Sequence, residues 1–173
     1  AKNRTFGYTC DIDRTTRGAD RALGDIDAAI ADLRWRQDVA SGTLLIGGVS
    51  RGGVLSIAYA GQHPRQVAGV INFVGGWLGE GCPTATAVNH SLFERGAVFP
   101  KPTIWLYGQH DRFYSMAHSR DNFAAFEKAG GRGQFVEFDM PFGQGHSLAD
   151  HPNLWSGPIG SYLSALSGAE KKQ

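Results

Sequence analysis

The stretch TLLIGGVSRGGVLSIAYAG, residues 43–61, decides the fold. It opens with a short apolar run of the length of a buried strand, and residues 52–60, rich in small side chains, are typical of a helix. Between them lies Ser50, in the pattern Gly-x-Ser-x-Gly. A sharp strand-to-helix turn here would expose the serine hydroxyl above the end of the strand. An N-capping serine with glycines for packing is the alternative interpretation.

The alternation of strand and helix continues outward from this stretch. Further apolar runs predict strands at 67–75, 103–108 and 134–140. Helical patterns are found at 16–35, 52–60, 85–95 and 115–129, and a last helix carries Trp155, Ile159, Tyr162 and Leu163 and ends near Gly168. Strands that alternate with helices predict a three-layer α/β sandwich with a mostly parallel sheet. We expect residues 1–173 to form one domain.

Composition narrows the classes of function. The chain has 173 residues, of which 42% are hydrophobic and 19% charged, and its formal net charge is +1. The sequence contains no block of like charges of the kind that binds nucleic acid. It also contains no apolar run that approaches the roughly 18 residues of a membrane helix. No signal peptide begins at Ala1, so that either none existed or it was removed.

A catalytic role for Ser50 requires partner residues elsewhere in the chain. A hydroxyl is a weak nucleophile unless a base removes its proton, so a carboxylate and then a histidine should follow later strands. Asp111 lies just beyond the strand at 103–108, and His146 lies in the glycine-rich loop after the strand at 134–140. Taken alone, Asp111 could be a solvated aspartate in a turn, and His146 could be a histidine in a surface loop. Together, in this order, Ser50, Asp111 and His146 predict a catalytic triad.

Other acids and histidines fit these roles less well. His110 lies too close to the strand end, directly before Asp111, to be oriented by that residue. His118 lies within a predicted helix. His151 precedes a proline at the start of the last helix. Asp139, at the end of the fourth strand, is the runner-up acid, and Asp150 is the weakest candidate.

Five segments carry a resemblance to a known family: GGVSRGG, GVINFVGGW, PTIWLYGQHDRFYS, FAAFEKAGG and FGQGHSLADHPNLW. Together they span most of residues 17–168, and they resemble the α/β-hydrolase fold, specifically its dienelactone-hydrolase-like branch. The resemblance implies a nucleophile at Ser50, an acid at Asp111 and a base at His146.

Two departures from the family matter. Dienelactone hydrolases in the strict sense use a cysteine nucleophile, and the serine here favours a general carboxylesterase. The fold normally has about twice the predicted number of strands, so the chain resembles its C-terminal portion and lacks the loop that donates the second oxyanion N–H. We therefore expect that the sequence is part of a longer polypeptide, that a second copy covers the edge of the first strand, or that residues 1–15 fold back over it.

Several further residues are candidates for the site. The backbone N–H of Arg51, at the start of the helix after Ser50, would point at a developing oxyanion. Trp77, Phe113, Tyr114 and Phe142 follow strand ends and would line a substrate pocket. The alternative is that these aromatic side chains pack in the core or the loops.

The two cysteines, Cys10 and Cys82, match no metal-binding spacing. They are either reduced thiols or one disulfide, which would imply an oxidising compartment. Because relatives in the resembling branch are often exported, a disulfide and a periplasmic or secreted location are favoured over the cytoplasm.

The sequence thus predicts a serine carboxylesterase that acts on small-molecule esters without a metal or an organic cofactor. A thioesterase, transacylase or peptidase could use the same triad. A non-catalytic binding module with a hydrolase-like fold is the alternative from another class.

Overall fold

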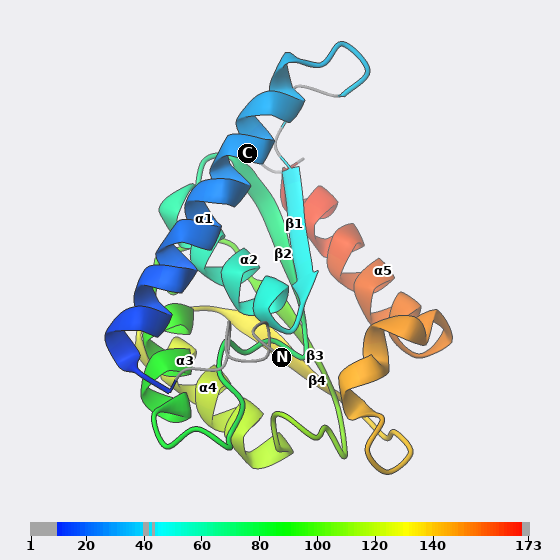
Figure 1. Cartoon of the computed structure of the whole chain (residues 1–173). Helices are drawn as coiled ribbons and strands as arrows, with labels where there is room; N and C mark the ends of the chain where they lie inside the picture. Colours follow the sequence, from blue (N-terminus) through cyan, green and yellow to red (C-terminus); the bar gives the residue numbers. More distant parts are fainter. Residues whose placement is uncertain (1–9, 40–41, 43, 171–173) are drawn as a thin grey trace.

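The computed structural model describes residues 10–39, 42 and 44–170. In this part of the chain, strands and helices alternate (Figure 1). The strands are β1 (Leu44–Val49), β2 (Val67–Phe73), β3 (Thr103–Gly108) and β4 (Gly133–Phe138). The helices are α1 (Ile12–Trp35), α2 (Arg51–Gln62), α3 (Ala85–Glu94), α4 (Met116–Lys128) and α5 (Pro152–Glu170), with a 3₁₀ helix, η2 (Gly145–Asp150). None of these helices is both long and apolar enough to cross a bilayer.

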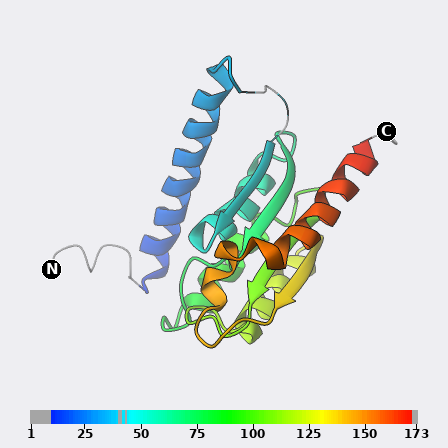
Figure 2. The same cartoon turned by 90° about the vertical axis from the view of Figure 1, so that its right-hand side faces the viewer.

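The strands form a parallel sheet in the order β1–β2–β3–β4, which is also their order in the sequence. Helix α2 packs on β1 and β2, α4 packs on β3 and β4, and α5 packs on β2 and β3. Figure 2 shows α1 and α5 on opposite sides of the sheet. The predicted three-layer α/β sandwich is therefore confirmed. The sequence predicted a mostly parallel sheet, and in the described residues every strand pair is parallel.

Strand β3 forms the centre of the core, and each of its residues is buried. The ring of Trp105 lies 4.5 to 5.1 Å, between centroids, from the rings of Phe93, Phe123 and Phe126. The indole N–H of Trp105 donates to Thr103 Oγ1 at 2.8 Å, so its one polar atom is satisfied. The loop that follows β3 therefore starts from a firmly packed strand.

Tyr162 joins α5 to the sheet. Its buried hydroxyl accepts a hydrogen bond from Val70 N at 2.8 Å and donates one to Pro102 O at 2.9 Å. Burial raises the pKa of the Tyr162 hydroxyl above its ordinary value. Gly69 permits this contact, since a Cβ there would lie 2.7 Å from the Tyr162 hydroxyl oxygen.

Strand β1 lies at an edge of the sheet, and its residues alternate between half-buried and exposed. Directly after it, Ser50 N donates to Phe73 O of β2 at 2.9 Å. By alternation, the N–H groups of Leu45, Gly47 and Val49 point away from β2. The side chains of Leu45 and Val49 are 48% and 43% exposed, so this edge is apolar as well as open.

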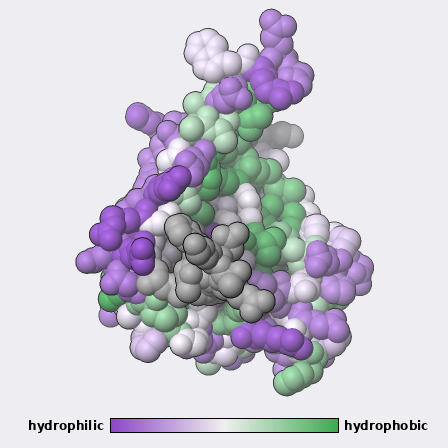
Figure 3. Space-filling model, viewed as in Figure 1, coloured by the Kyte–Doolittle hydropathy of each residue, from purple (hydrophilic) through white to green (hydrophobic). Residues whose placement is uncertain are grey.

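An apolar groove of about 440 Å³ runs between β1 and α1. Ile26, Ile30 and Leu33 line it from α1, and Leu44 and Ile46 line it from β1. Figure 3 shows apolar side chains continuing from the inner flank of α1 to β1, whereas the outer flank of α1 is hydrophilic. The C-terminal half of α1 thus turns its apolar stripe toward the groove beside the open edge.

The N-terminal end of α1 is fixed to the loop that follows β2. The helix begins at Ile12, four residues earlier than predicted, because the Asp11 side chain accepts a hydrogen bond from Arg14 N at 2.7 Å and caps it. Cys10 and Cys82 are joined in a disulfide across 72 residues of sequence. Thr84 Oγ1 donates to Cys10 O at 2.6 Å beside it.

Removing this disulfide should lower stability, because the unfolded chain gains the freedom of a long loop. We expect the double substitution Cys10→Ser, Cys82→Ser to reduce the free energy of unfolding by about 2–4 kcal/mol in urea denaturation. The wild-type protein in a thiol reductant should fall to the same value. Equal stability of oxidised and reduced wild-type protein would contradict the expectation.

Candidate functional site

The site is built on the turn between β1 and α2, where Ser50 has a left-handed backbone with φ of 56° and ψ of −120°. Ser50 N donates to Phe73 O at 2.9 Å, and Ser50 O accepts from Gly76 N at 3.2 Å and from Gly53 N at 3.0 Å. Such a backbone costs about 1–3 kcal/mol for a residue other than glycine, so the surrounding hydrogen bonds must hold it. The turn therefore directs the serine side chain outward from the end of β1.

Strained backbone recurs along the same end of the sheet. In the described residues, positive φ outside glycine occurs at Ser50, Val74 (41°) and His110 (61°), which follow β1, β2 and β3 respectively. Val74 is β-branched and fully buried, so its conformation is imposed by its neighbours. Strain that clusters at the carboxyl ends of parallel strands indicates a functional edge of the sheet.

The glycines around Ser50 have unequal roles. A Cβ at Gly48 would overlap the backbone of Gly52, and a Cβ at Gly53 would overlap Asn72 Oδ1. A Cβ at Gly52 itself would meet no atom within 4 Å. Of the two glycines in the Gly-x-Ser-x-Gly pattern, only Gly48 is therefore required by packing, and the second tight contact is at Gly53.

Asp111 lies in the loop after β3, with its side chain only 1% exposed. Its Oδ1 accepts from Phe113 N at 2.7 Å and from Tyr114 N at 3.2 Å, which fixes the carboxylate on its own loop. Its Oδ2 faces the ring of His146, and Nδ1 of that ring donates to it at 2.8 Å. Both carboxylate oxygens of Asp111 are therefore used.

His146 is held in η2, a short 3₁₀ helix in place of the irregular loop that we predicted. The preceding residue is Gly145, where a Cβ would lie 2.6 Å from Asp111 N. A Cβ at Gly108, the last residue of β3, would likewise lie 2.6 Å from Gly145 O. Two glycines thus let η2 pack directly on the end of β3, which brings the imidazole to the carboxylate.

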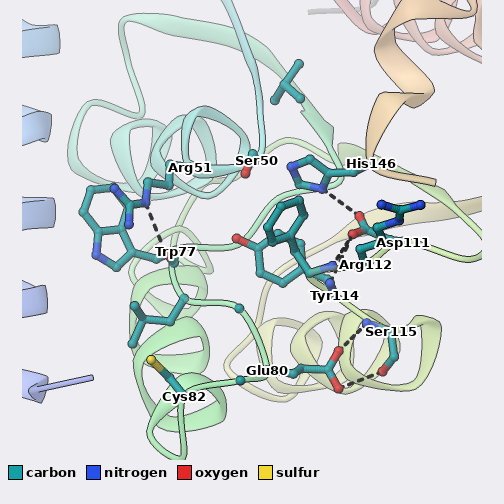
Figure 4. Close-up of a pocket in the computed structure, with 15 residues that line it drawn as sticks. Ser50, Arg51, Trp77, Glu80, Cys82, Asp111, Arg112, Tyr114, Ser115 and His146 are labelled. Carbon is teal, nitrogen blue, oxygen red and sulfur yellow. Dashed lines mark hydrogen bonds and ion pairs between the residues drawn. The ribbon is translucent and has the colours of Figure 1, made fainter. Parts of the chain in front are cut away.

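The proton between Asp111 and His146 can be assigned from chemistry. A carboxylate oxygen only accepts hydrogen bonds, so Nδ1 carries the proton and Nε2 remains an acceptor. Figure 4 shows the carboxylate, the ring and Ser50 at one end of a shared cavity. Within the described residues, Ser50 Oγ and His146 Nε2 form no direct hydrogen bond in this structure.

The cavity has a volume of about 900 Å³ and opens to solvent. The rings of Phe113 and Tyr114 lie 4.7 and 5.7 Å from the ring of His146, between centroids. The Arg51 guanidinium lies 4.9 Å from the centre of the Trp77 ring, and its Nε donates to Trp77 O at 3.3 Å. The lining of the cavity therefore combines aromatic rings with charged side chains.

The residues proposed for the pocket fall into two groups. Trp77, Phe113 and Tyr114 line the cavity, as does Arg51. Phe142 does not line it: its side chain is 86% exposed and lies against the ring of His110 outside the cavity. The glycines around Phe142 gave no periodicity from which to place it.

The rival acid and bases lie away from this arrangement. His118 is buried within α4, and Asp139 is exposed beyond the end of β4. His110 lies on the exposed side of its turn. No three His, Cys, Asp or Glu side chains of the described residues gather closely enough to hold a metal ion.

Sequence reasoning missed two polar residues that shape the cavity. Glu80 lines it, and its carboxylate accepts from the backbone N–H and the hydroxyl of Ser115, the N-cap of α4. Asn89 of α3 is fully buried and hydrogen-bonds the backbone of Trp77 and Leu78. Asn89 interrupts an apolar helix face, and that was the only sequence signal for it.

The sequence matches no family model and no curated protein. The structure is similar to a Klebsiella pneumoniae protein described as a dienelactone hydrolase, with 22% identity over 71% of this chain and a TM-score of 0.51. It is similar to an esterase from Pyrococcus furiosus, with 12% identity over 85% of the chain and a TM-score of 0.62. A monoacylglycerol lipase from Paleococcus ferrophilus shares 15% identity over 86% of the chain, with a TM-score of 0.57.

These similarities show that the chain has the α/β-hydrolase fold, which confirms the fold implied by the sequence. The chain covers 50% of the Klebsiella protein, 62% of the Pyrococcus esterase and 76% of the Paleococcus lipase. It thus spans about half to three quarters of these structures. At such low identities, the structural similarity shows the fold alone. Support for a particular reaction has to come from the geometry of the site.

The unequal glycines give a test of the turn. Gly48→Ala should lower the free energy of unfolding by about 2 kcal/mol or more, because the new methyl group overlaps backbone that cannot move aside. Gly52→Ala is the matched control, and we expect it to change stability by no more than about 1 kcal/mol. Chemical denaturation of both variants checks this, and equal effects of the two substitutions would overturn the packing described for the turn.

Proposed function

We propose that this α/β-hydrolase-fold protein is a serine hydrolase that cleaves carboxylic esters. The observation that carries the proposal is the 2.8 Å hydrogen bond between Asp111 and His146, beside the serine of a strained strand-to-helix turn. Carboxylate, imidazole and hydroxyl follow three parallel strands in the chain order that this fold uses for a triad. Similar structures described as esterases, a lipase and a dienelactone hydrolase support the same class of reaction.

In the proposed mechanism, His146 Nε2 takes the proton of Ser50 as the serine oxygen attacks the ester carbonyl carbon. Asp111 holds the ring in the required tautomer and stabilises the imidazolium that forms. The imidazolium then gives its proton to the departing alcohol, and water repeats the cycle on the acyl-enzyme. Serine and imidazole must first close to hydrogen-bond distance, as commonly happens when substrate binds.

The tetrahedral intermediate needs hydrogen-bond donors for its oxyanion. Arg51 is the first residue of α2, so its backbone N–H belongs to the positive end of that helix beside Ser50. We assign it as an oxyanion donor. Losing one of two donors typically costs a factor of about 10²–10³ in rate, so a second donor would greatly increase activity.

The cavity supports small or soluble esters as substrates. The aromatic side chains of Trp77, Phe113 and Tyr114 offer apolar contacts for an acyl or alcohol group beside Ser50. Within the part of the chain that the structure describes, the cavity opens widely to solvent, which favours access by such substrates. The Cys10–Cys82 disulfide supports a place of action in an oxidising compartment, the periplasm or the extracellular space.

We also infer that the open edge of β1 is covered in the working protein. Its outward N–H and C=O groups and the exposed Leu45 and Val49 form an edge of the kind that pairs with another strand. Of residues 1–15, which the sequence analysis offered as a third cover, residues 1–9 lie outside the described part of the chain and residues 12–15 begin α1. We therefore propose that the covering strand belongs either to a longer polypeptide or to a second copy of this chain. The chain spans half to three quarters of the length of the three similar structures described above, which is consistent with a covering strand from a longer polypeptide.

The proposed nucleophile can be tested directly. We expect Ser50→Ala to lower kcat/KM for p-nitrophenyl acetate by at least about 10³-fold, because the proposed acyl-enzyme forms on the Ser50 oxygen. Ser56→Ala is the control, since Ser56 is a buried serine on α2 that hydrogen-bonds Gly52 O and lies outside the cavity. Retained turnover in Ser50→Ala would contradict the assignment.

A fluorophosphonate probe separates the catalytic proposal from a non-catalytic module. Covalent labelling of wild-type protein at Ser50, lost in Ser50→Ala, is the expected result, since labelling requires an activated hydroxyl. An unlabelled wild-type protein with no ester turnover would favour a binding module. Parallel assays with thioester and peptide substrates would reveal a thioesterase, transacylase or peptidase.

The open edge predicts association of the 173-residue chain when it is produced alone. We expect concentration-dependent dimers or larger species in sedimentation velocity, and we expect Leu45→Lys to shift them toward the monomer by placing a charge at the edge. Val98→Lys is the control, because Val98 is 70% exposed and belongs to the connection between α3 and β3 rather than to β1. A monomer at every concentration, unchanged by Leu45→Lys, would contradict the inference.

A further inference from the structure

One side of the cavity is formed by residues 77–82, which we call the cavity wall. All residues of the wall line the cavity, and none belongs to a helix or a strand. A segment without its own backbone ladder keeps its shape only through contacts with other elements. The wall is held at its far end by the disulfide of Cys82 and in its middle by the pairing of Glu80 with Ser115.

At the end of the wall nearest Ser50, Arg51 contacts Trp77 as described above, and Asn89 of α3 binds the backbone of both Trp77 and Leu78. Asn89 Oδ1 accepts from Trp77 N at 2.8 Å and from Leu78 N at 3.0 Å, and its Nδ2 donates to Leu78 O at 2.9 Å. Asn89 is fully buried, so water cannot replace these bonds. The two backbone donors also fix which end of the amide is oxygen.

The remaining hydrogen of Asn89 Nδ2 is directed at His118 Nε2, at 2.9 Å. Because Nδ2 is a donor, Nε2 must be the acceptor, and the His118 ring is neutral in this arrangement. A proton on Nε2 would place two donors face to face in a buried site. The geometry therefore links the protonation of His118 to the residue that holds the wall.

The surroundings of His118 favour its neutral form at neutral pH. Burial lowers its pKa from the ordinary 6.5, and His90 on α3 acts in the same direction. Glu80 on the wall and Asp121 on α4 act in the opposite direction. The ring of Tyr114 stacks on that of His118, with 6.3 Å between centroids.

We propose that Asn89 is a positioning residue of the active site: it fixes the wall against which the substrate packs, and neutral His118 keeps its amide in place. The proposal rests on the ester-hydrolase function above. Asn89 has no direct hydrogen bond to the proposed triad, and it acts on the wall through the backbone of Trp77 and Leu78. Its loss should therefore weaken substrate binding and leave the activation of Ser50 intact. Acid should loosen the wall in the same way, as pH falls below 6.5 through the pKa of His118.

The first test compares Asn89→Leu with wild type. We expect KM for a p-nitrophenyl ester to rise about tenfold or more, with the rate of labelling by a small fluorophosphonate within about twofold of wild type. Hydrogen exchange should show loss of protection at the amides of Trp77 and Leu78. Thr86→Leu, a substitution at an exposed position of the same helix, is the matched control. It should leave KM, the labelling rate and the protection of the two amides unchanged.

Two conservative variants keep the inference testable if Asn89→Leu does not fold. Asn89→Asp retains an acceptor for both wall amides and should preserve most of their protection. His118→Gln offers an amide oxygen to Asn89 and does not titrate. Wild-type protection at the two amides, corrected for intrinsic exchange, should therefore fall as the pH is lowered below 6.5 through the pKa of His118, whereas that of His118→Gln should stay constant over the same range.

The inference would be overturned if the wall amides stayed protected in Asn89→Leu, or if they lost protection with KM unchanged. It would also be overturned if His118→Gln showed the same loss of protection in acid as wild type. A wild-type protein that neither turned over esters nor reacted with the probe would overturn the proposed function. Hydrogen exchange would still decide in that case whether Asn89 holds the wall.

Discussion

The backbone of Ser50 can stay in its left-handed conformation only because β2 and the loop after it hold it there. The hydrogen bond to Phe73 O joins Ser50 to the end of β2, which is itself paired with β3, and the bond from Gly76 N joins it to the loop that follows β2. Asp111 stands on the loop that leaves β3, and His146 is packed against that same strand end through Gly108 and Gly145. One continuous piece of sheet therefore sets the relative positions of the serine, the carboxylate and the imidazole.

Most of the architecture could be predicted from the sequence, because it depends on periodicity. Apolar runs located all four strands to within a few residues, and the apolar stripe of residues 16–35 located α1. Chain order alone gave Ser50, Asp111 and His146, since parallel strands bring the loops at their carboxyl ends together. Ser115 was predicted as the cap of α4 and accepts the hydrogen bond from His118 N that this role requires.

What the sequence could not give depends on contacts between distant segments. Glycine-rich loops have no period, so η2 and the exposed position of Phe142 could not be foreseen. The pattern around Ser50 did not reveal that Gly53, rather than Gly52, is packed tightly. In the sequence, Asn89 is only a polar residue that interrupts an apolar helix face, and the fold is needed to show that the amides of residues 77–78 donate to its side chain.

Because the strands lie in the sheet in their order of synthesis, each can join a neighbour that has already left the ribosome. Ser50 is made before Asp111, which follows after two more strands, and His146 comes only with the last helical segments. A nascent chain therefore carries Ser50 without its proposed base until η2 has been made. Under the proposed function, ester cleavage begins only when this C-terminal segment docks on the end of β3.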